Sequence, residues 1–243
     1  MRIDRHRYRR VVVLTGAGVS AASGLRTFRG PGGIWKQHDV ERLGHVDALL
    51  KRPAETWTLF GSMREPVRTA RPNAAHVALA KWEAELAPDH ELVLVTQNVD
   101  GLHQAAGSRH VCEIHGNVMY TRCTNPECTL ERYWDENAHA RAVPACPLCA
   151  APLRPDVVLF GEDLPARAAW TAKKALRDCD LFLAVGTSGT VSPAAGFVRG
   201  AEFAGARTIL VNLEPMLERN PAFQEEYLGK AEDVLPELLG LAP

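Results

Sequence analysis

The sequence lacks the defining features of several protein classes. None of its apolar runs reaches the roughly 18 consecutive residues that a membrane-spanning helix needs. Charge of one sign is not in excess, since the formal net charge is -1 over 243 residues, and such a chain has no broad positive field for collecting nucleic acid. Residues 1–10 are too few and too polar for a secretory signal. We therefore expect a cytoplasmic protein that binds no membrane and no specific nucleic acid.

Cysteine is scarce, and most of it is clustered. Of the six cysteines, four form two close pairs within a short stretch: Cys123 with Cys128, and Cys146 with Cys149. In a reducing compartment this pattern indicates a metal site instead of disulfides. Four thiolates suit a tetrahedral zinc ion and leave no coordination position open for water. The pattern predicts one structural zinc, with a solitary iron or a redox pair as alternatives.

The arrangement of apolar runs predicts an α/β fold. Five short β-rich runs, at residues 11–15, 92–96, 157–160, 181–185 and 208–213, alternate with alanine-rich stretches of helical character. Such alternation is typical of a Rossmann-like, doubly wound parallel sheet wrapped by helices. Residues 32–75, which read as helices, and residues 120–155, which carry the paired cysteines, interrupt the alternation. We expect these two segments to form a smaller lobe.

A glycine-rich turn follows the first expected strand. The run Gly16-Ala17-Gly18-Val19-Ser20 lies where a dinucleotide-binding fold brings its backbone close to a pyrophosphate, although tight packing alone also explains such glycines. A hydride-transfer enzyme would carry an acidic ribose partner about 20 residues later. A glycine-rich loop with Thr27, Phe28, Arg29 and Trp35 stands there instead, and Arg29 offers a fixed charge for phosphate.

Further polar groups follow later strands. Gln97, Asn98, Val99 and Asp100 end the second expected strand, where ligands bind in sheets of this kind, although a helix cap is the alternative. His115 is followed by glycine, and a neutral imidazole near cytosolic pH is a suitable general base. Two later turns lie where an adenosine would cross the far half of the sheet: Gly186-Thr187-Ser188 and Asn212-Leu213-Glu214.

Taken together, these motifs resemble the sirtuins, a family of NAD-dependent protein deacylases. The resemblance runs from about residue 11 to residue 236 and rests on GAGVSAASGLRTFRG, TQNVDGLH, the HG at His115, the four cysteines, PDVVLFGE, GTSGTVSPAAG and VNLEP. It implies a large NAD-binding domain (1–31, 76–119 and 156–243), a helical module (32–75) and a zinc ribbon (120–155). NAD, consumed as a co-substrate, and an acyl-lysine peptide would enter the cleft between the lobes.

The resemblance also assigns roles by matching motif. His115 would be the general base on a ribose hydroxyl, while Asn98 and Asp100 would serve the nicotinamide end and count as catalytic. The remaining cofactor contacts would be Gly16, Ala17, Gly18, Ser20, Thr27, Phe28, Arg29, Trp35, Gln97, Val99, Gly186, Thr187, Ser188, Asn212, Leu213, Glu214 and Ala231. The substrate backbone would pair with Val157, Val158, Phe160, Gly161 and Glu162, with Val191 opposite. The acyl oxygen would attack the ribose carbon as nicotinamide leaves, and the products would be free lysine, nicotinamide and acylated ADP-ribose.

One departure from the family bears on the acyl group. Sirtuins that remove succinyl and malonyl groups carry a Tyr and an Arg three residues apart, and counting back from Pro72 places Phe60 and Met63 at these positions. Without the arginine, a buried acyl carboxylate lacks a charge-assisted partner worth about 1.5 to 3 kcal/mol. We therefore expect acetyl or another uncharged acyl group. Arg64 is the alternative counterpart if the register slips by one residue.

Other functions remain open at this stage. A desuccinylase or demalonylase would use Arg64, and a protein ADP-ribosyltransferase would use the same nucleotide site, although His115 favours deacylation. A zinc-containing nucleic-acid module is disfavoured by the nearly neutral charge, and a redox enzyme by the missing acidic ribose partner. We expect a monomer that acts on acylated-lysine proteins or peptides.

Overall fold

Six parallel strands form the larger sheet of the protein, in the order β3-β2-β1-β7-β8-β9. The computed structural model describes residues 2–27, 40–139 and 142–241. The strands are β1 (Arg10–Thr15), β2 (Glu91–Thr96), β3 (Val111–Glu113), β7 (Leu181–Val185), β8 (Arg207–Asn212) and β9 (Glu225–Leu228). Because the chain moves outward from β1 in one direction and then returns to β7 on its other side, the order reverses between β1 and β7. A ligand cleft is expected at the carboxyl ends of these two strands.

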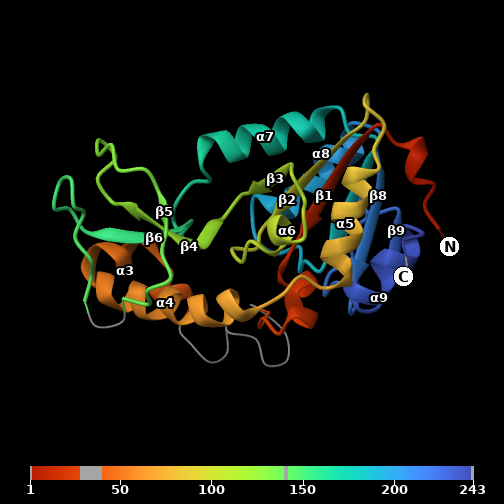
Figure 1. Cartoon of the computed structure of the whole chain (residues 1–243). Coiled ribbons are helices and arrows are strands. Elements are labelled where there is room, and N and C mark those ends of the chain that lie inside the picture. Colours follow the sequence, from red (N-terminus) through yellow and green to blue (C-terminus); the bar gives the residue numbers. More distant parts are fainter. Residues whose placement is uncertain (1, 28–39, 140–141, 242–243) are drawn as a thin grey trace.

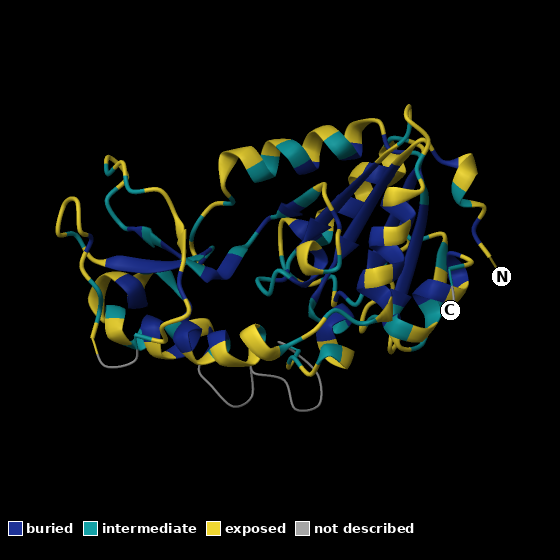
Figure 2. Cartoon of the chain, in the orientation of Figure 1, coloured by how far each residue is buried: buried dark blue, intermediate teal, exposed yellow. Residues whose placement is uncertain are grey.

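Helices cover both faces of this sheet (Figure 1). On one face Val11 and Val13 of β1 pack with Leu79 of α5 (Ala74–Ala84) and Leu235 of α9 (Ala231–Leu238). On the other face Val12 and Leu14 join a cluster with α7 (Ala166–Arg177) and α8 (Phe197–Phe203). Strands covered on both faces must be apolar at every position, which is why β7 is buried throughout its length (Figure 2). Short elements complete this lobe: η1 (Arg5–Arg7), η2 (Ala17–Ser23), α6 (Leu102–Ala105) and η3 (Ala194–Gly196).

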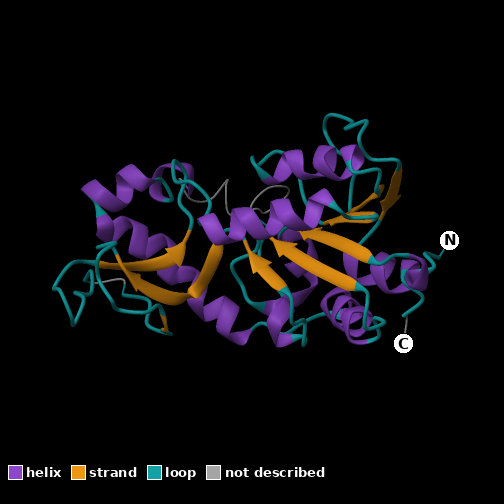
Figure 3. Cartoon of the chain, turned by 90° about the horizontal axis from the view of Figure 1, so that it is seen from above, coloured by secondary structure: helices purple, strands orange, loops and turns teal. Residues whose placement is uncertain are grey.

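A smaller lobe extends from the carboxyl side of the large sheet (Figures 1 and 3). Its antiparallel sheet has the order β5-β4-β6, with β4 (Gly116–Cys123), β5 (Tyr133–Trp134) and β6 (Leu153–Val157). The helix α4 (Pro53–Thr69) packs on this sheet, and α2 (Val40–Leu43) and α3 (Val46–Lys51) pack against α4. An apolar cluster between α4 and the strands joins Phe60 to Val118, Met119 and Val157. Two segments far apart in the sequence therefore share one core.

The predicted fold class is confirmed, while individual elements differ from expectation. The apolar run 157–160 is not a strand of the parallel sheet, because the strand there is β6, which ends at Val157 and pairs antiparallel with β4. β9 was not predicted, since this edge strand is only half-buried and has no apolar run. The small sheet begins at Gly116 and ends at Val157, a few residues beyond the 120–155 range; the division into domains stays a prediction. Within the described residues no helix is long and apolar enough to span a membrane.

Candidate functional site

Two glycine-containing turns meet at the point where the strand order reverses. The turn after β1 donates its Gly16 N–H to Val185 O at 3.0 Å and its Gly18 N–H to Gly186 O at 2.9 Å. A Cβ on Gly16 would lie 2.6 Å from Gly186 O, and one on Gly186 would lie 2.5 Å from the nitrogen of Val19. These glycines are therefore required by the close packing of the two turns against each other. The sequence interpretation, backbone approach to a pyrophosphate, is not needed to explain them.

A polar network lies beside these turns. Ser20 Oγ donates to Asp100 Oδ2 at 2.7 Å, and it accepts from Asn98 Nδ2 at 3.2 Å. Asn98 also donates to Gly16 O at 3.1 Å. Burial raises the pKa of Asp100, while hydrogen bonds from the Leu102 N–H and from Ser20 lower it by less. The sequence-predicted residues Ser20, Asn98 and Asp100 thus form one connected group at the carboxyl ends of β1 and β2.

His115 lies at the start of the small lobe with a defined tautomer. Its Nδ1 lies 3.0 Å from the backbone oxygen of Gln97. Because a carbonyl oxygen can only accept, Nδ1 carries the proton and Nε2 keeps its lone pair. Burial lowers the pKa of His115 below its usual 6.5, and the bond to Gln97 raises it by less. A neutral imidazole with an open Nε2 is the form that a general base requires.

Thr187 connects the predicted cofactor residues of three strands. Gln97 Nε2 donates to Thr187 Oγ1 at 2.9 Å, and Asn212 Nδ2 donates to Thr187 O at 3.0 Å. Gln97 and Thr187 follow β2 and β7, and Asn212 is the last residue of β8, so these three strand ends form one continuous rim. The carboxyl edge of the sheet is therefore held together by side-chain amides.

The other predicted cofactor residues differ in exposure. Ser188, Leu213 and Glu214 are exposed, whereas Ala231 is buried at the start of α9 and belongs to a core cluster. Ala17, Thr27 and Val99 are partly buried. Phe28, Arg29 and Trp35 lie outside the described residues.

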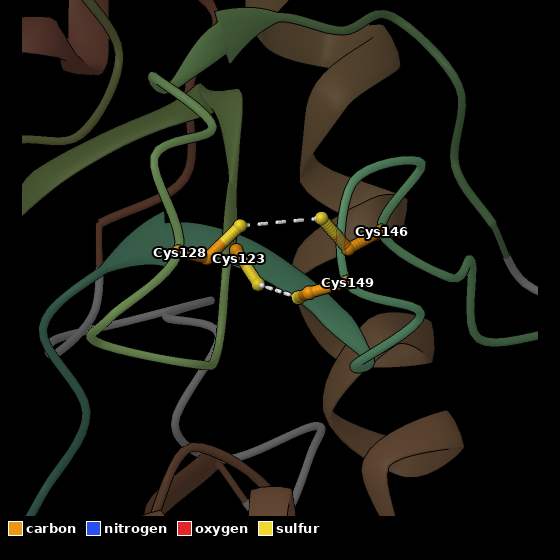
Figure 4. Close-up of side chains that lie close together, drawn as sticks. All are labelled: Cys123, Cys128, Cys146 and Cys149. Carbon is orange, nitrogen blue, oxygen red and sulfur yellow. Dashed lines mark hydrogen bonds between the residues drawn. The ribbon is translucent and has the colours of Figure 1, made fainter.

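The four predicted metal ligands come together in the small lobe. All four sulfur atoms lie within 4.8 Å of one another, with Cys123 Sγ 3.5 Å from Cys149 Sγ and Cys128 Sγ 3.6 Å from Cys146 Sγ. Figure 4 shows these side chains converging on one point from the end of β4, the turn after it and the turn before β6. Zn–S bonds of about 2.3 Å in a tetrahedron place sulfurs about 3.8 Å apart, so the cluster fits one zinc ion that all four cysteines would hold.

The wall predicted to face the acyl group is apolar. Phe60 is buried, Met63 is partly buried, and both pack with Val118, Val157 and Leu159. An apolar wall of this kind favours an uncharged acyl group over a charged one.

Arg64, the alternative acyl-carboxylate partner, is fully engaged elsewhere. Its side chain is 1% exposed, and the guanidinium lies over the Trp57 ring at 5.1 Å. Each of its N–H groups has an acceptor in the small lobe: Val118 O, Asn137 O, Tyr120 O, Thr121 Oγ1 and, at 3.0 Å, Asp135 Oδ2. Arg64 therefore joins α4 to β4 and has no donor left for an acyl carboxylate.

The segment predicted to bind the substrate backbone is already partly paired. Phe160 N donates to Gly44 O and Phe160 O accepts from Val46 N, each at 2.9 Å. The Glu162 carboxylate accepts two bonds from Arg154. Phe160 and Glu162 therefore do not offer these groups to a peptide, although the Phe160 ring is partly exposed. Val191, the residue expected opposite, is half-buried.

Two buried histidines were missed as site residues. His76 Nδ1 accepts from Asn73 N at 3.3 Å, so its Nε2–H faces Ser20 Oγ at 3.5 Å. His103 Nε2 lies 3.0 Å from Thr15 Oγ1, and the two imidazole centroids are 4.7 Å apart. The signal was present in the sequence, since His76 ends the PNAAH run and His103 ends TQNVDGLH, but a lone histidine gives no indication of its partner.

Comparison with known proteins gives consistent matches. The model of the Sir2 family matches residues 16–193. The chain is 41% identical to an NAD-dependent protein deacylase of Salmonella typhimurium, covering 95% of this chain and 82% of that one. It is 42% identical to NAD-dependent protein deacylase 2 of Pyrobaculum aerophilum, covering 95% and 90%. A solved Sir2 homologue mutant in complex with ADP-ribose superposes with a TM-score of 0.88 at 36% identity, covering 96% and 91%. A Sir2 homologue–NAD complex gives a TM-score of 0.85 at 36% identity, covering 96% and 89%.

Proposed function

The chain belongs to the Sir2 family and is an NAD-dependent protein deacylase, and from this premise we propose that His115 is the general base of its reaction. The observation that carries this proposal is the bond between His115 Nδ1 and Gln97 O. It holds the ring in the tautomer whose Nε2 can take a proton from a hydroxyl group. Burial keeps the imidazole neutral at neutral pH.

The nucleotide is proposed to lie across the carboxyl edge of the large sheet. NAD supplies an electrophilic ribose carbon and nicotinamide as its leaving group. Ser20, Asn98 and Asp100 would bind the nicotinamide end, because they form one network beside the turn after β1. Thr187 and Asn212 would bind toward the adenosine, where the rim continues along β7 and β8.

The acyl group is proposed to be uncharged, with acetyl as the preferred case. Phe60 and Met63 lie in an apolar cluster, and Arg64 is occupied by its own acceptors in the small lobe. A succinyl carboxylate placed there would lose its hydration without gaining a cationic partner. This argues against the desuccinylase alternative.

The zinc ion is proposed to be structural and not catalytic. Four cysteine ligands fill a tetrahedral site, so no position is left for substrate or water. The ion would join the turn after β4 to the turn before β6 and so stabilise the small-lobe sheet.

The test incubates the protein with NAD and parallel acetyl-lysine and succinyl-lysine peptides, and follows nicotinamide and deacylated peptide by mass spectrometry. Stoichiometric nicotinamide release with the acetyl peptide, abolished in His115→Ala, is the expected result. Faster turnover of the succinyl peptide would refute the proposed acyl preference. ADP-ribose transferred to protein instead of deacylated peptide would replace deacylation by the transferase alternative.

The remaining parts of the proposal concern the protein in the cell. The substrates are acylated-lysine proteins, since a related Sir2 structure holds a deacetylated peptide with acetyl ADP-ribose. We further propose that the protein acts in the cytoplasm, where its cysteines stay reduced for metal binding, and that it acts as a monomer. Size-exclusion chromatography with light scattering measures the molar mass in solution and so tests whether the protein is a monomer.

A further inference from the structure

The segment of residues 158–162, which follows β6, is an irregular turn held by hydrogen bonds to its surroundings. Phe160 is bonded on both sides, to Gly44 O and to Val46 N. Val158 N donates to His115 O at 2.9 Å. The segment is thereby fixed to the helical module on one side and to the backbone of the proposed general base on the other.

A buried ion pair closes this turn from behind. Arg154, on β6, is 4% exposed, and its Nη1 and Nη2 donate to the two carboxylate oxygens of Glu162 at 2.5 and 2.9 Å. The same guanidinium donates to Val157 O at 2.8 Å. Glu162 Oε2 in turn accepts from Leu159 N at 2.8 Å. The beginning, middle and end of the turn are therefore joined through one arginine–carboxylate pair.

The electrostatics favour an ionised pair. Burial alone would raise the pKa of Glu162, but the hydrogen bonds from Arg154 and from Leu159 N more than offset this, so the pKa is lowered. Bidentate arginine–carboxylate bonds are both strong and restrictive in geometry. Glu162 is thus committed to shaping the turn and is not free to bind substrate.

The bonding pattern leaves a specific set of backbone groups for a ligand. In the described part of the chain, Val158 N, Leu159 N and O, and Phe160 N and O all have backbone or carboxylate partners. No hydrogen bond there uses Val158 O or the N–H and carbonyl of Gly161. An added peptide strand requires such unpaired groups on one side of its template.

We propose that the Arg154–Glu162 pair is a positioning device that holds Val158 O and the backbone of Gly161 in register for the acyl-lysine peptide. The inference rests on the proposed deacylase function and narrows its peptide site to these groups. Arg154 and Glu162 act through the turn and are positioning residues. Loss of the Glu162 carboxylate weakens the bonds to Leu159 N and to Arg154, lets the turn relax, and so weakens peptide binding while the rim at the ends of β2, β7 and β8 stays intact.

The experiment compares Glu162→Gln with a matched control. Glu225→Gln breaks another bidentate pair, in which Arg207 donates to Glu225 at 2.6 and 2.8 Å, on β8 and β9 at the far edge of the large sheet. We expect Glu162→Gln to raise KM for the acetyl peptide by about tenfold and to leave KM for NAD within twofold. Glu225→Gln should change neither constant. Equal peptide KM values in the two variants would overturn the proposal.

Two further measurements keep the result decisive. Arg154→Lys keeps the charge but loses the bidentate geometry, so its peptide KM should lie between those of the wild type and Glu162→Gln. Residue-resolved hydrogen exchange on the wild type needs no variant: the acetyl peptide should protect the Gly161 amide, whereas the Leu159 amide should be protected already in the free protein. An unprotected Gly161 amide in the complex would refute the inference. If the wild type releases no nicotinamide with any acyl peptide, the proposed function fails instead.

Discussion

His115 Nδ1 lies 3.0 Å from the backbone oxygen of Gln97, and this bond joins the first residue before the small-lobe sheet to the end of a large-lobe strand. The side chain of Gln97 also donates to Thr187 Oγ1 at 2.9 Å, so Gln97 is fixed within the large lobe. The orientation of the proposed base is therefore set by the same residue that joins the rim at the ends of β2, β7 and β8.

The first prediction concerns pH and catalysis. Burial lowers the pKa of His115 below 6.5, so the base is already neutral at pH 6.5 and becomes protonated, and inactive, only below its lowered pKa. We expect kcat/KM for the acetyl peptide to be level between about pH 7 and 8 and to fall about tenfold per unit well below its pKa. A midpoint at or above pH 7 would contradict this assignment.

A second prediction concerns pH and stability. Burial lowers the pKa of His76 from 6.5 to about 4. In the unfolded chain His76 is protonated as the pH falls through about 6.5, whereas in the folded protein it stays neutral until about pH 4. The neutral His76 therefore contributes its full share to the free energy of unfolding above pH 6.5, and this share is lost as the pH falls to about 4. The loss should reach about 3 kcal/mol. Urea unfolding at several pH values should give a shallower pH dependence in His76→Gln than in the wild type, and equal slopes would contradict the prediction.

The acyl preference should be reversible by design. In the double variant Phe60→Tyr with Met63→Arg, the introduced guanidinium places a cation beside the apolar cluster that contains these two positions. We expect the succinyl-to-acetyl ratio of kcat/KM to rise by about ten- to a hundredfold, as a charge-assisted bond allows. Met63→Gln, which is polar but uncharged, is the control and should give no such gain. Failure of the double variant to exceed Met63→Gln would show that this wall does not face the acyl group.

Arg64 should matter for stability more than for acyl choice. Arg64→Met leaves the buried Asp135 without its cation, which typically costs about 3 to 5 kcal/mol. Denaturant unfolding measures this loss. Arg68→Met, which removes an exposed ion pair on the same helix, should leave the midpoint nearly unchanged. A succinyl activity that disappears in Arg64→Met would restore the alternative register.

Removal of the metal should reduce stability and activity together. Elemental analysis should find one zinc per chain, held by the four cysteines. Chelation should lower Tm and abolish activity together, and added zinc should restore both, because the ion stabilises the small lobe that carries part of the cleft. Retention of the full Tm after the zinc has been removed would show that the ribbon is stable without it.

The sequence predicted the features that depend on local pattern. Short, mostly apolar runs located β1, β2, β7 and β8 to within a residue at each end, and cysteine spacing located the metal cluster. It could not assign side-chain partners, which depend on how distant segments pack. The partner of His76, the five acceptors of Arg64 and the pairing of Arg154 with Glu162 all join residues whose proximity no spacing reveals. The run 157–160 was misplaced for a related reason, since an apolar run does not indicate which of two sheets it joins.

The contact between the turns after β1 and β7 limits how this protein can change over evolutionary time. At Gly16 and Gly186 the obstacle to any side chain is a main-chain atom, 2.6 and 2.5 Å away. A compensating substitution elsewhere cannot remove a carbonyl oxygen or a peptide nitrogen. Only glycine is therefore expected at these two positions in descendants of this protein. Change at this end of the sheet is left to the side chains around the rim.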